Sequence, residues 1–192
     1  QRNPTYNHFK RYQFQMDLLD VQALAPYNDG IRYILTVIDT FTRYAFCRLI
    51  KNKTGIIVLD AFKSVLKEAG SYPLHLVLDG GSEFHNKLFI NFCINEGINI
   101  HTPDSSTHGA FIERFNRTIQ DLIYKYLTEN ETNRYIDVFY SLLNTYNNRK
   151  HRMINITPCQ AERDPSTHLD IRLLSAKRIE KIKAKKQFFQ IG

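Results

Sequence analysis

Residues 33–49 read YILTVIDTFTRYAFCRL, two runs of β-branched and aromatic residues with a short polar segment between them. Runs of this composition are typical of β-strands, and we expect strands at residues 33–39 and 44–49. A similar run, FQMDLLD, precedes them at residues 14–20. Because short connections join neighbouring antiparallel strands, the sequence predicts a three-stranded meander.

Downstream of this meander, the hydrophobic spacing changes from that of a strand to that of a helix. Val58, Phe62 and Val65 recur at helical intervals, and Gly70 is placed to end the helix. Further on we expect a strand, a short helix and a strand, at residues 74–79, 87–96 and 98–101. Together these elements predict an α/β fold with a mixed five-stranded sheet and helices packed on its faces.

The second half of the chain is expected to be helical, because two apolar stripes recur there at helical spacing. The first stripe consists of Ile112, Phe115, Ile119, Leu122, Ile123 and Tyr126. The second lies in a helix expected at about residues 132–147 and consists of Tyr135, Ile136, Phe139, Leu142, Leu143 and Tyr146. Such stripes are typical of a core or of subunit contacts, and we expect subunits to associate through the second. A last short helix is expected to begin at Thr157-Pro158.

The composition is that of an ordinary globular domain, with 192 residues of which 43% are apolar and 23% charged. No apolar run reaches the roughly 18 residues that cross a bilayer, so we expect a soluble protein with no membrane partner. The three cysteines have no C-x-x-C spacing, which argues against a disulfide framework or a cysteine zinc centre. The sequence also lacks a P-loop and the G-x-S-x-G motif of serine hydrolases.

Basic charge is concentrated at the end of the chain. Residues 171–192 hold 7 of the 26 Lys and Arg residues but only 1 of the 19 acidic residues. Such a tail is typical of a protein with a polyanionic partner, most often nucleic acid, although a solvated helix or linker explains it equally well. We expect an N-terminal arm or linker at residues 1–11, a globular core at 12–165 and a basic linker at 166–192.

Three acidic residues stand where a folded sheet presents reactive groups. Asp17 interrupts an apolar strand, Asp79 closes another just before two glycines, and Glu113 lies on the polar side of a helix. The same helix face carries groups that bind phosphates and bases, namely Asn116, Arg117 and Gln120. Three carboxylates favour a hard cation, Mg²⁺ or Mn²⁺, and two such ions about 3.5–4 Å apart catalyse phosphoryl transfer.

Ordinary structural roles compete with this interpretation. An aspartate in a strand is more often a cap or a salt-bridge partner, and a helix glutamate is by default a surface residue. Asp39 and Glu83 are further acids near the expected site, but capping and loop hydrogen bonds explain them equally well.

Four short motifs together resemble the catalytic core of a retroviral-type integrase. They occur in the order FQMD, YILTVID through RY, DGGSEF and ERFNRT, at residues 14–17, 33–44, 79–84 and 113–118. The resemblance covers about residues 10–165. Three further segments, at residues 51–55, 134–138 and 146–152, resemble the integrases of Maverick/Polinton self-synthesising DNA transposons and their viral relatives.

The resemblance implies a ribonuclease-H-like fold and a D,D,E triad. In that triad Asp17 and Asp79 bind one divalent ion, and Asp17 and Glu113 bind the other. The implied reaction is hydrolysis near the 3′ ends of element DNA, followed by attack of the freed 3′-OH on target DNA in the nucleus. The alternative is a domesticated, catalytically inactive DNA-binding or oligomerisation domain of the same fold.

The family resemblance also implies partners and further domains. We expect a homo-oligomer of at least two subunits that binds the ends of an element and its target DNA. The residues assigned to DNA are His108, Asn116, Arg117, Gln120, Lys177 and Arg178; His108 stands where the family usually has a lysine. Because such integrases have a zinc domain upstream and a small β-barrel or chromodomain downstream, we expect this chain to be a core-domain fragment.

Overall fold

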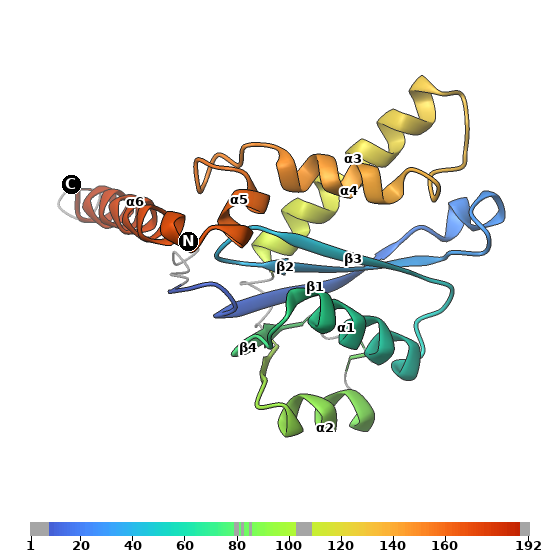
Figure 1. Ribbon diagram of the computed structural model, residues 1–192, viewed down its shortest axis with the longest axis horizontal. Helices are drawn as coiled ribbons and strands as arrows, with labels where there is room; N and C mark the ends of the chain where they lie inside the picture. Colours follow the sequence, from blue (N-terminus) through green and yellow to red (C-terminus); the bar gives the residue numbers. More distant parts are fainter. Residues whose placement is uncertain (1–7, 79–80, 82, 85, 103–108, 189–192) are drawn as a thin grey trace.

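The chain folds around one sheet in the computed structural model, which describes residues 8–188 except 79–80, 82, 85 and 103–108 (Figure 1). The strands are β1 (Gln13–Asp20), β2 (Tyr33–Asp39), β3 (Ala45–Ile50), β4 (His75–Val77) and β5 (Asn99–His101). Their order in the sheet is β3-β2-β1-β4-β5. The first three strands pair antiparallel, whereas β4 pairs parallel to both β1 and β5. The mixed five-stranded sheet predicted from the sequence is therefore confirmed.

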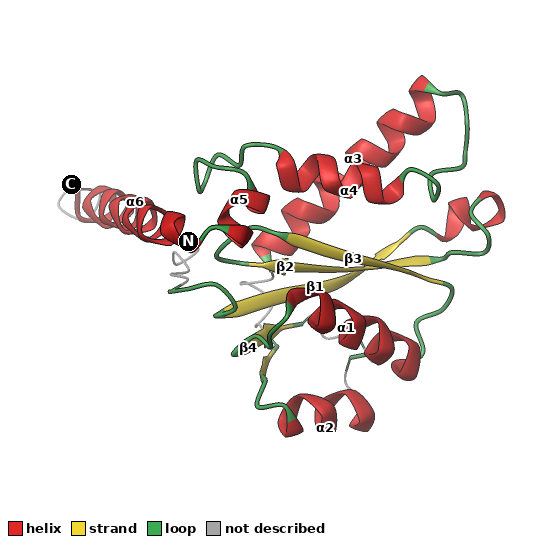
Figure 2. Ribbon diagram, viewed as in Figure 1, coloured by secondary structure: helices red, strands yellow, loops and turns green. Residues whose placement is uncertain are grey.

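Helices cover both faces of the sheet (Figure 2). On one face lie α1 (Gly55–Ala69) and α2 (Lys87–Asn95), and on the other lie α3 (Ala110–Glu129) and α4 (Phe139–Asn148). The remaining helices are α5 (Pro158–Arg163), α6 (His168–Phe188) and the 3₁₀ helices η1 (Gln22–Tyr27) and η2 (Pro165–Thr167). Most of α6 extends away from the body of the molecule. Among the described helices, none is both long and apolar enough to span a bilayer.

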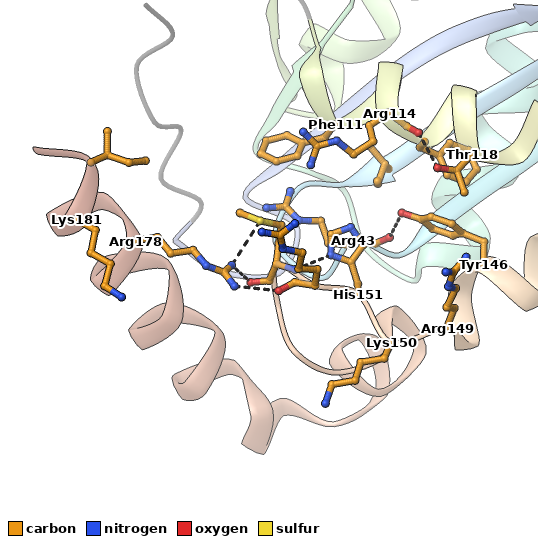
Figure 3. A pocket seen from close by; sticks show the side chains of 15 residues that line it. Arg43, Phe111, Arg114, Thr118, Tyr146, Arg149, Lys150, His151, Arg178 and Lys181 are labelled. Carbon is orange, nitrogen blue, oxygen red and sulfur yellow. Dashed lines mark hydrogen bonds between the residues drawn. The ribbon is translucent and has the colours of Figure 1, made fainter. Parts of the chain in front are cut away.

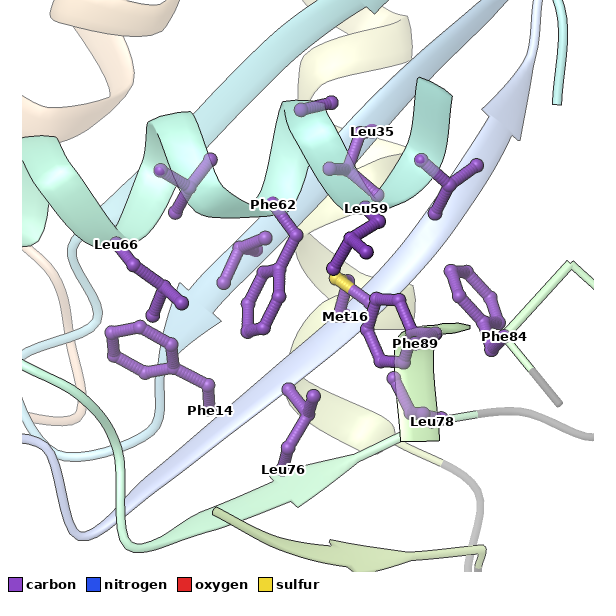
Figure 4. Packing of buried hydrophobic residues seen from close by; sticks show 14 of the residues in the cluster. Phe14, Met16, Leu35, Leu59, Phe62, Leu66, Leu76, Leu78, Phe84 and Phe89 are labelled. Carbon is purple, nitrogen blue, oxygen red and sulfur yellow. The ribbon is translucent and has the colours of Figure 1, made fainter. Parts of the chain in front are cut away.

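Strand β1 separates two different environments, because successive side chains of a strand point to opposite faces of the sheet. Phe14 and Met16 point toward α1 and α2, into a cluster of apolar side chains that includes Phe62 and Phe89 (Figure 4). Leu19, of the opposite parity, belongs to the second apolar cluster, beneath α3 and α4. Polar Gln15 and Asp17 have the same parity as Leu19 and so point toward α3.

Helix α1 follows its sequence pattern closely. Its buried residues include Val58, Phe62 and Val65, and it ends at Gly70, whose φ of 72° is left-handed. Glycine adopts this conformation without the penalty that a Cβ imposes, and its N–H donates to the Leu66 carbonyl at 3.0 Å. The predicted helix and its end are therefore confirmed.

Helix α4 begins at Phe139, so the prediction of a helix from about residue 132 was wrong. The cause is Asn28, which is buried at the end of η1. Its Oδ1 accepts hydrogen bonds from the backbone N–H groups of Tyr135 and Ile136 at 2.8 and 3.2 Å. Its Nδ2 donates to the Asn133 carbonyl at 2.8 Å. These bonds hold the segment before α4 in a turn, and η1 was itself not expected from the sequence.

The apolar stripe of residues 135–146 lies inside the subunit. Tyr135 and Phe139 are fully buried and pack with Phe115 and Ile119 of α3 in the cluster beneath α3 and α4. Phe139 is thus an ordinary core residue in the described structure. Residues of the same subunit bury this stripe, so a partner subunit is not needed to shield it from solvent.

Candidate active site

Asp17 lies in the middle of β1 with both carboxylate oxygens engaged. Oδ1 accepts from the backbone N–H of Leu18 at 2.7 Å, and Oδ2 accepts from Nδ2 of Asn116 at 2.7 Å. Asn116 is on α3 and is only 7% exposed. The carboxylate is therefore held in one orientation by α3 and by its own strand.

Gln15, two residues earlier on the same face of β1, fixes the beginning of α3. Its Oε1 accepts from the N–H groups of Phe111 and Ile112, both at 3.1 Å. These are among the helix N–H groups that have no partner within the helix itself. Gly109 allows this approach, because a Cβ there would lie 3.1 Å from Gln15 Oε1 and 2.7 Å from Ile112 Cγ2.

Glu113 lies in the first turn of α3 with its side chain exposed. Asn116 follows three residues later, and residues at this spacing have Cβ atoms about 5–6 Å apart on one side of a helix. The hydrogen bond between Asn116 and Asp17 therefore brings Asp17 to the turn of α3 that carries Glu113. Asp17 and Glu113, which are 96 positions apart in the sequence, therefore lie on two elements in contact, β1 and α3.

Two of the predicted site residues, Asp79 and His108, lie outside the described residues. The triad as a whole and the DNA contact of His108 therefore stay predictions. Among the described residues, no group of three His, Cys, Asp or Glu side chains could hold a metal ion.

The remaining residues assigned to DNA have different environments. Arg117 is exposed and Gln120 is half-buried on α3, whereas Asn116 is buried against Asp17. Lys177 is exposed on α6. Arg178 donates to the backbone carbonyl of Met153 and, at 2.9 Å, to that of Arg152. These bonds join α6 to the segment between α4 and α5, and DNA binding by all five residues stays a prediction.

Asp39 and Glu83, the two further acids, have structural partners. Fully buried Asp39 accepts from Nη1 and the backbone N–H of Arg11, both at 2.9 Å, and from the N–H groups of Phe41 and Thr42. It thereby organises the turn between β2 and β3. Glu83 pairs with Lys53 at 3.4 Å.

A basic pocket beside α3 was not foreseen from the sequence. It has a volume of about 840 Å³ and is lined by residues of α3, of α4 and the segment after it, and of α6, together with Arg43 (Figure 3). The basic run Arg149-Lys150-His151-Arg152 could have indicated an anion-binding site. The pocket itself could not be predicted, because Arg43 and Arg114 lie far from this run in the sequence.

The donor set around Asp17 fits a divalent cation. Hydrogen bonds from the Leu18 N–H and from Asn116 Nδ2 orient the two carboxylate oxygens of Asp17. Hard cations prefer such oxygens, and hydrogen bonds from neighbouring groups commonly orient metal ligands. Asp17 and Glu113 are therefore suitable ligands for Mg²⁺ or Mn²⁺.

Comparisons with known proteins identify the family of this chain. The model of the integrase core domain family matches residues 10–106. A transposon-derived protein of Caenorhabditis elegans is 34% identical over 145 residues, which cover 75% of this chain. The chain spans only 51% of the length of that relative.

Solved integrase structures show the same fold. A chain of the simian T-cell lymphotropic virus intasome, solved with the PP2A regulatory subunit B56 gamma, has a TM-score of 0.74 at 20% identity, covering 84% of this chain and 57% of that one. The HTLV-2 integrase catalytic core domain with magnesium, in its trimeric form, has a TM-score of 0.67 at 22% identity, covering 80% and 97%. These likenesses confirm the ribonuclease-H-like fold, and with the family match they show that the chain belongs to the integrase core domain family.

Proposed function

We propose that this chain is the catalytic core of a DNA integrase, which hydrolyses element DNA near its 3′ ends and joins the freed 3′-OH to target DNA. Its catalytic and metal-binding residues are Asp17, Asp79 and Glu113. The observation that carries the proposal is the hydrogen bond from Asn116 to Asp17, because it brings the first acid of the motif to the helix turn of the third.

Divalent ions would be held by the carboxylates of Asp17, Asp79 and Glu113. When bound, such ions activate an attacking oxygen and stabilise the charge on the leaving oxygen in phosphoryl transfer. The protein contributes orientation: Asn116 and Leu18 fix the carboxylate of Asp17, and Gln15 fixes the start of α3. Exposed Glu113 remains accessible to ion and DNA from the solvent side.

The test measures metal binding and DNA cutting separately. Mn²⁺ binding is followed by water-proton relaxation, and cutting by nicking of supercoiled plasmid in Mg²⁺ or Mn²⁺. We expect Asp17→Asn and Glu113→Gln to weaken Mn²⁺ binding and to slow nicking at least about 100-fold. Glu129→Gln, at the far end of α3, removes the same charge and should change neither.

Two results would contradict the proposal. One is nicking by Glu113→Gln at the rate of the unmodified chain, and the other is nicking that persists in EDTA. A chain that binds DNA but neither nicks it nor binds Mn²⁺ would instead be a catalytically inactive, DNA-binding relative of the same fold.

The proposal extends to the partners of the protein. The HTLV-2 core domain has been solved in trimeric and dimeric forms, which supports a homo-oligomer of at least two subunits here. The motifs at residues 51–55, 134–138 and 146–152 support an element of the Maverick/Polinton type. Integration into chromosomal DNA places the action in the nucleus, and the whole protein would carry further domains around this core.

A further inference from the structure

The basic pocket has a one-sided charge. Of the 15 described residues that line it, 7 are Lys or Arg and none is Asp or Glu. Arg114 comes from α3, Arg149, Lys150 and Arg152 follow one another after α4, and Arg178 reaches in from α6 (Figure 3). Several cations gathered in a hollow create a strongly positive local potential, which attracts anions. The pocket is therefore complementary to a polyanion.

Arg43, which lines this pocket, has two guanidinium nitrogens without a hydrogen-bonding partner among the described residues. Its side chain is only 7% exposed, and its Nε and Nη1 are buried with no hydrogen bond to any described residue. The guanidinium carbon lies 3.8 Å from the centroid of the Phe111 ring. Burial lowers the pKa of Arg43 to about 10, so the group still carries its charge at neutral pH.

The backbone of Arg43 also adopts a conformation that side chains disfavour. Its φ of 62° is left-handed, which is uncommon for any residue other than glycine, asparagine or aspartate. A buried charge without hydrogen bonds costs considerable free energy, and strained residues with such costs tend to occur at functional sites. A phosphate bound in the pocket beside the Arg43 guanidinium would offset this cost, because guanidinium groups pair strongly with phosphate oxygens.

We propose that the basic pocket binds a backbone phosphate of DNA, with Arg43 as its buried ligand and Arg149 and Lys150 as ligands at its mouth. This inference rests on the proposed function, which supplies DNA as the polyanion. The pocket volume of about 840 Å³ accommodates a phosphate together with its flanking sugars.

The position of the pocket relative to Glu113 indicates where bound DNA would lie relative to the candidate active site. Arg114 and Thr118 line the pocket and lie one turn apart on α3. Consecutive residues of a helix point about 100° apart, so Glu113 and Arg114 occupy neighbouring flanks of the same turn. DNA in the pocket would thus pass beside the candidate active site rather than through it, and would be positioned by contacts to its backbone.

The main experiment measures binding of a fluorescent 30-base-pair duplex to the 192-residue chain in EDTA, where no metal-dependent reaction occurs. Arg149→Gln/Lys150→Gln changes two exposed residues, and the slope of log K against log salt should flatten by about 1.8. The matched control, Lys63→Gln/Lys67→Gln, removes the same charge from α1 on the other face of the sheet and should leave the slope unchanged.

Arg43→Asn tests the buried ligand, since asparagine tolerates a left-handed φ. DNA binding should weaken at least tenfold, whereas the thermal midpoint without DNA should stay unchanged or rise. A purely structural Arg43 would give the reverse pattern, a lower midpoint with unchanged affinity of the folded protein. Equal salt slopes for Arg149→Gln/Lys150→Gln, the mouth variant, and for its control would also overturn the proposal.

A second set of probes distinguishes sources of the anion. The ¹H and ¹⁵N signals of His151, which lines the pocket, should shift on addition of either inorganic phosphate or duplex DNA. Binding of inorganic phosphate that DNA fails to displace, or binding of poly-glutamate as strong as that of DNA, would assign the pocket to another ligand and overturn the proposal.

The experiments distinguish failure of the pocket proposal from failure of the proposed catalytic function. If Glu113→Gln abolishes nicking but the mouth variant binds DNA normally, the active site stands and the pocket proposal falls. If the mouth variant loses DNA affinity while Glu113→Gln nicks normally, the pocket stands and the proposed catalytic site falls.

Discussion

The two faces of the sheet are built from different chemistry. Beneath α1 and α2 the buried cluster is mostly apolar, with Phe14, Met16 and Phe62 among its members, and buried Arg11 lies over the Phe14 ring at its border. Beneath α3 and α4 the apolar cluster is interrupted by buried polar side chains, which include Gln15 and Asn116. Apolar burial is non-directional, whereas a buried hydrogen bond fixes two groups at one distance and angle. We infer that the first face contributes stability and that the second also positions functional groups.

Asn147 of α4 illustrates how polar side chains align the second face. It is almost fully buried, and its amide pairs with the backbone of Ala45 through two hydrogen bonds of 2.9 Å each. Ala45 begins β3, an edge strand of the sheet, so the side chain substitutes for a neighbouring strand. The helix is thereby held at one register along the strand.

The largest expected effect belongs to the apolar face. Phe62→Ala should lower the free energy of unfolding by about 3–5 kcal/mol, because it leaves a cavity in a fully buried cluster. Urea unfolding measures the loss. Plasmid nicking per folded molecule, measured at low temperature, should stay normal, and a nicking defect in the folded fraction would mean that this face also positions the active site.

On the polar face, Asn116→Ala should act mainly on function. Loss of its hydrogen bond to the Asp17 carboxylate should cost about 1–3 kcal/mol of stability and slow nicking about 10–100-fold. Asn148→Ala on α4, where the amide is exposed, is the matched control. Equal nicking by the two variants would remove Asn116 from its positioning role.

Gln15→Met should have a smaller effect on stability than Asn116→Ala. The two N–H groups of α3 that Gln15 accepts from would lose their partner, at a cost of about 0.5–2 kcal/mol by analogy with helix caps. Gln13→Met, two residues earlier on β1, serves as the control. Hydrogen exchange at Phe111 and Ile112 should accelerate only in the first variant, and unchanged exchange would show that Gln15 does not hold α3.

The last prediction concerns a pH dependence of stability from His151, which lines the basic pocket. Burial, together with nearby Arg43, Arg114 and Arg178, lowers the pKa of His151 to about 4. Its Nδ1 also accepts from the Met153 N–H at 3.2 Å, which requires the unprotonated nitrogen. Between about pH 6.5 and 4 the unfolded state therefore binds the extra proton, and stability falls as the pH falls.

His151→Gln should reduce this loss of stability. Urea unfolding of both proteins at pH 7.5 and pH 5.0 checks it, with His8→Gln, exposed near the N-terminus, as the control. If the free energy of unfolding falls by the same amount from pH 7.5 to pH 5.0 in His151→Gln and in the unmodified chain, His151 does not cause the pH dependence.

The order of strands and helices could be predicted because its signals are local. Runs of β-branched and aromatic residues mark β2 and β3, and helical hydrophobic periods mark α1 and α3. Both signals depend only on residues within the element itself. The family motifs are local as well, so Asp17 and Glu113 could be singled out without the structure. Their catalytic roles stay predictions, as do the roles of Asp79 and His108.

Only the tertiary structure decided where distant residues meet. Asn28 accepts a hydrogen bond from the N–H of Tyr135, 107 positions later, and so holds the segment before α4 in a turn. No local preference of Tyr135 predicts this turn. The basic pocket joins Arg43 to residues more than 70 positions later in the chain, so its unpartnered guanidinium is visible only in three dimensions. Hydrogen bonds and electrostatic fields depend on distance in space, whereas a sequence pattern records only distance along the chain.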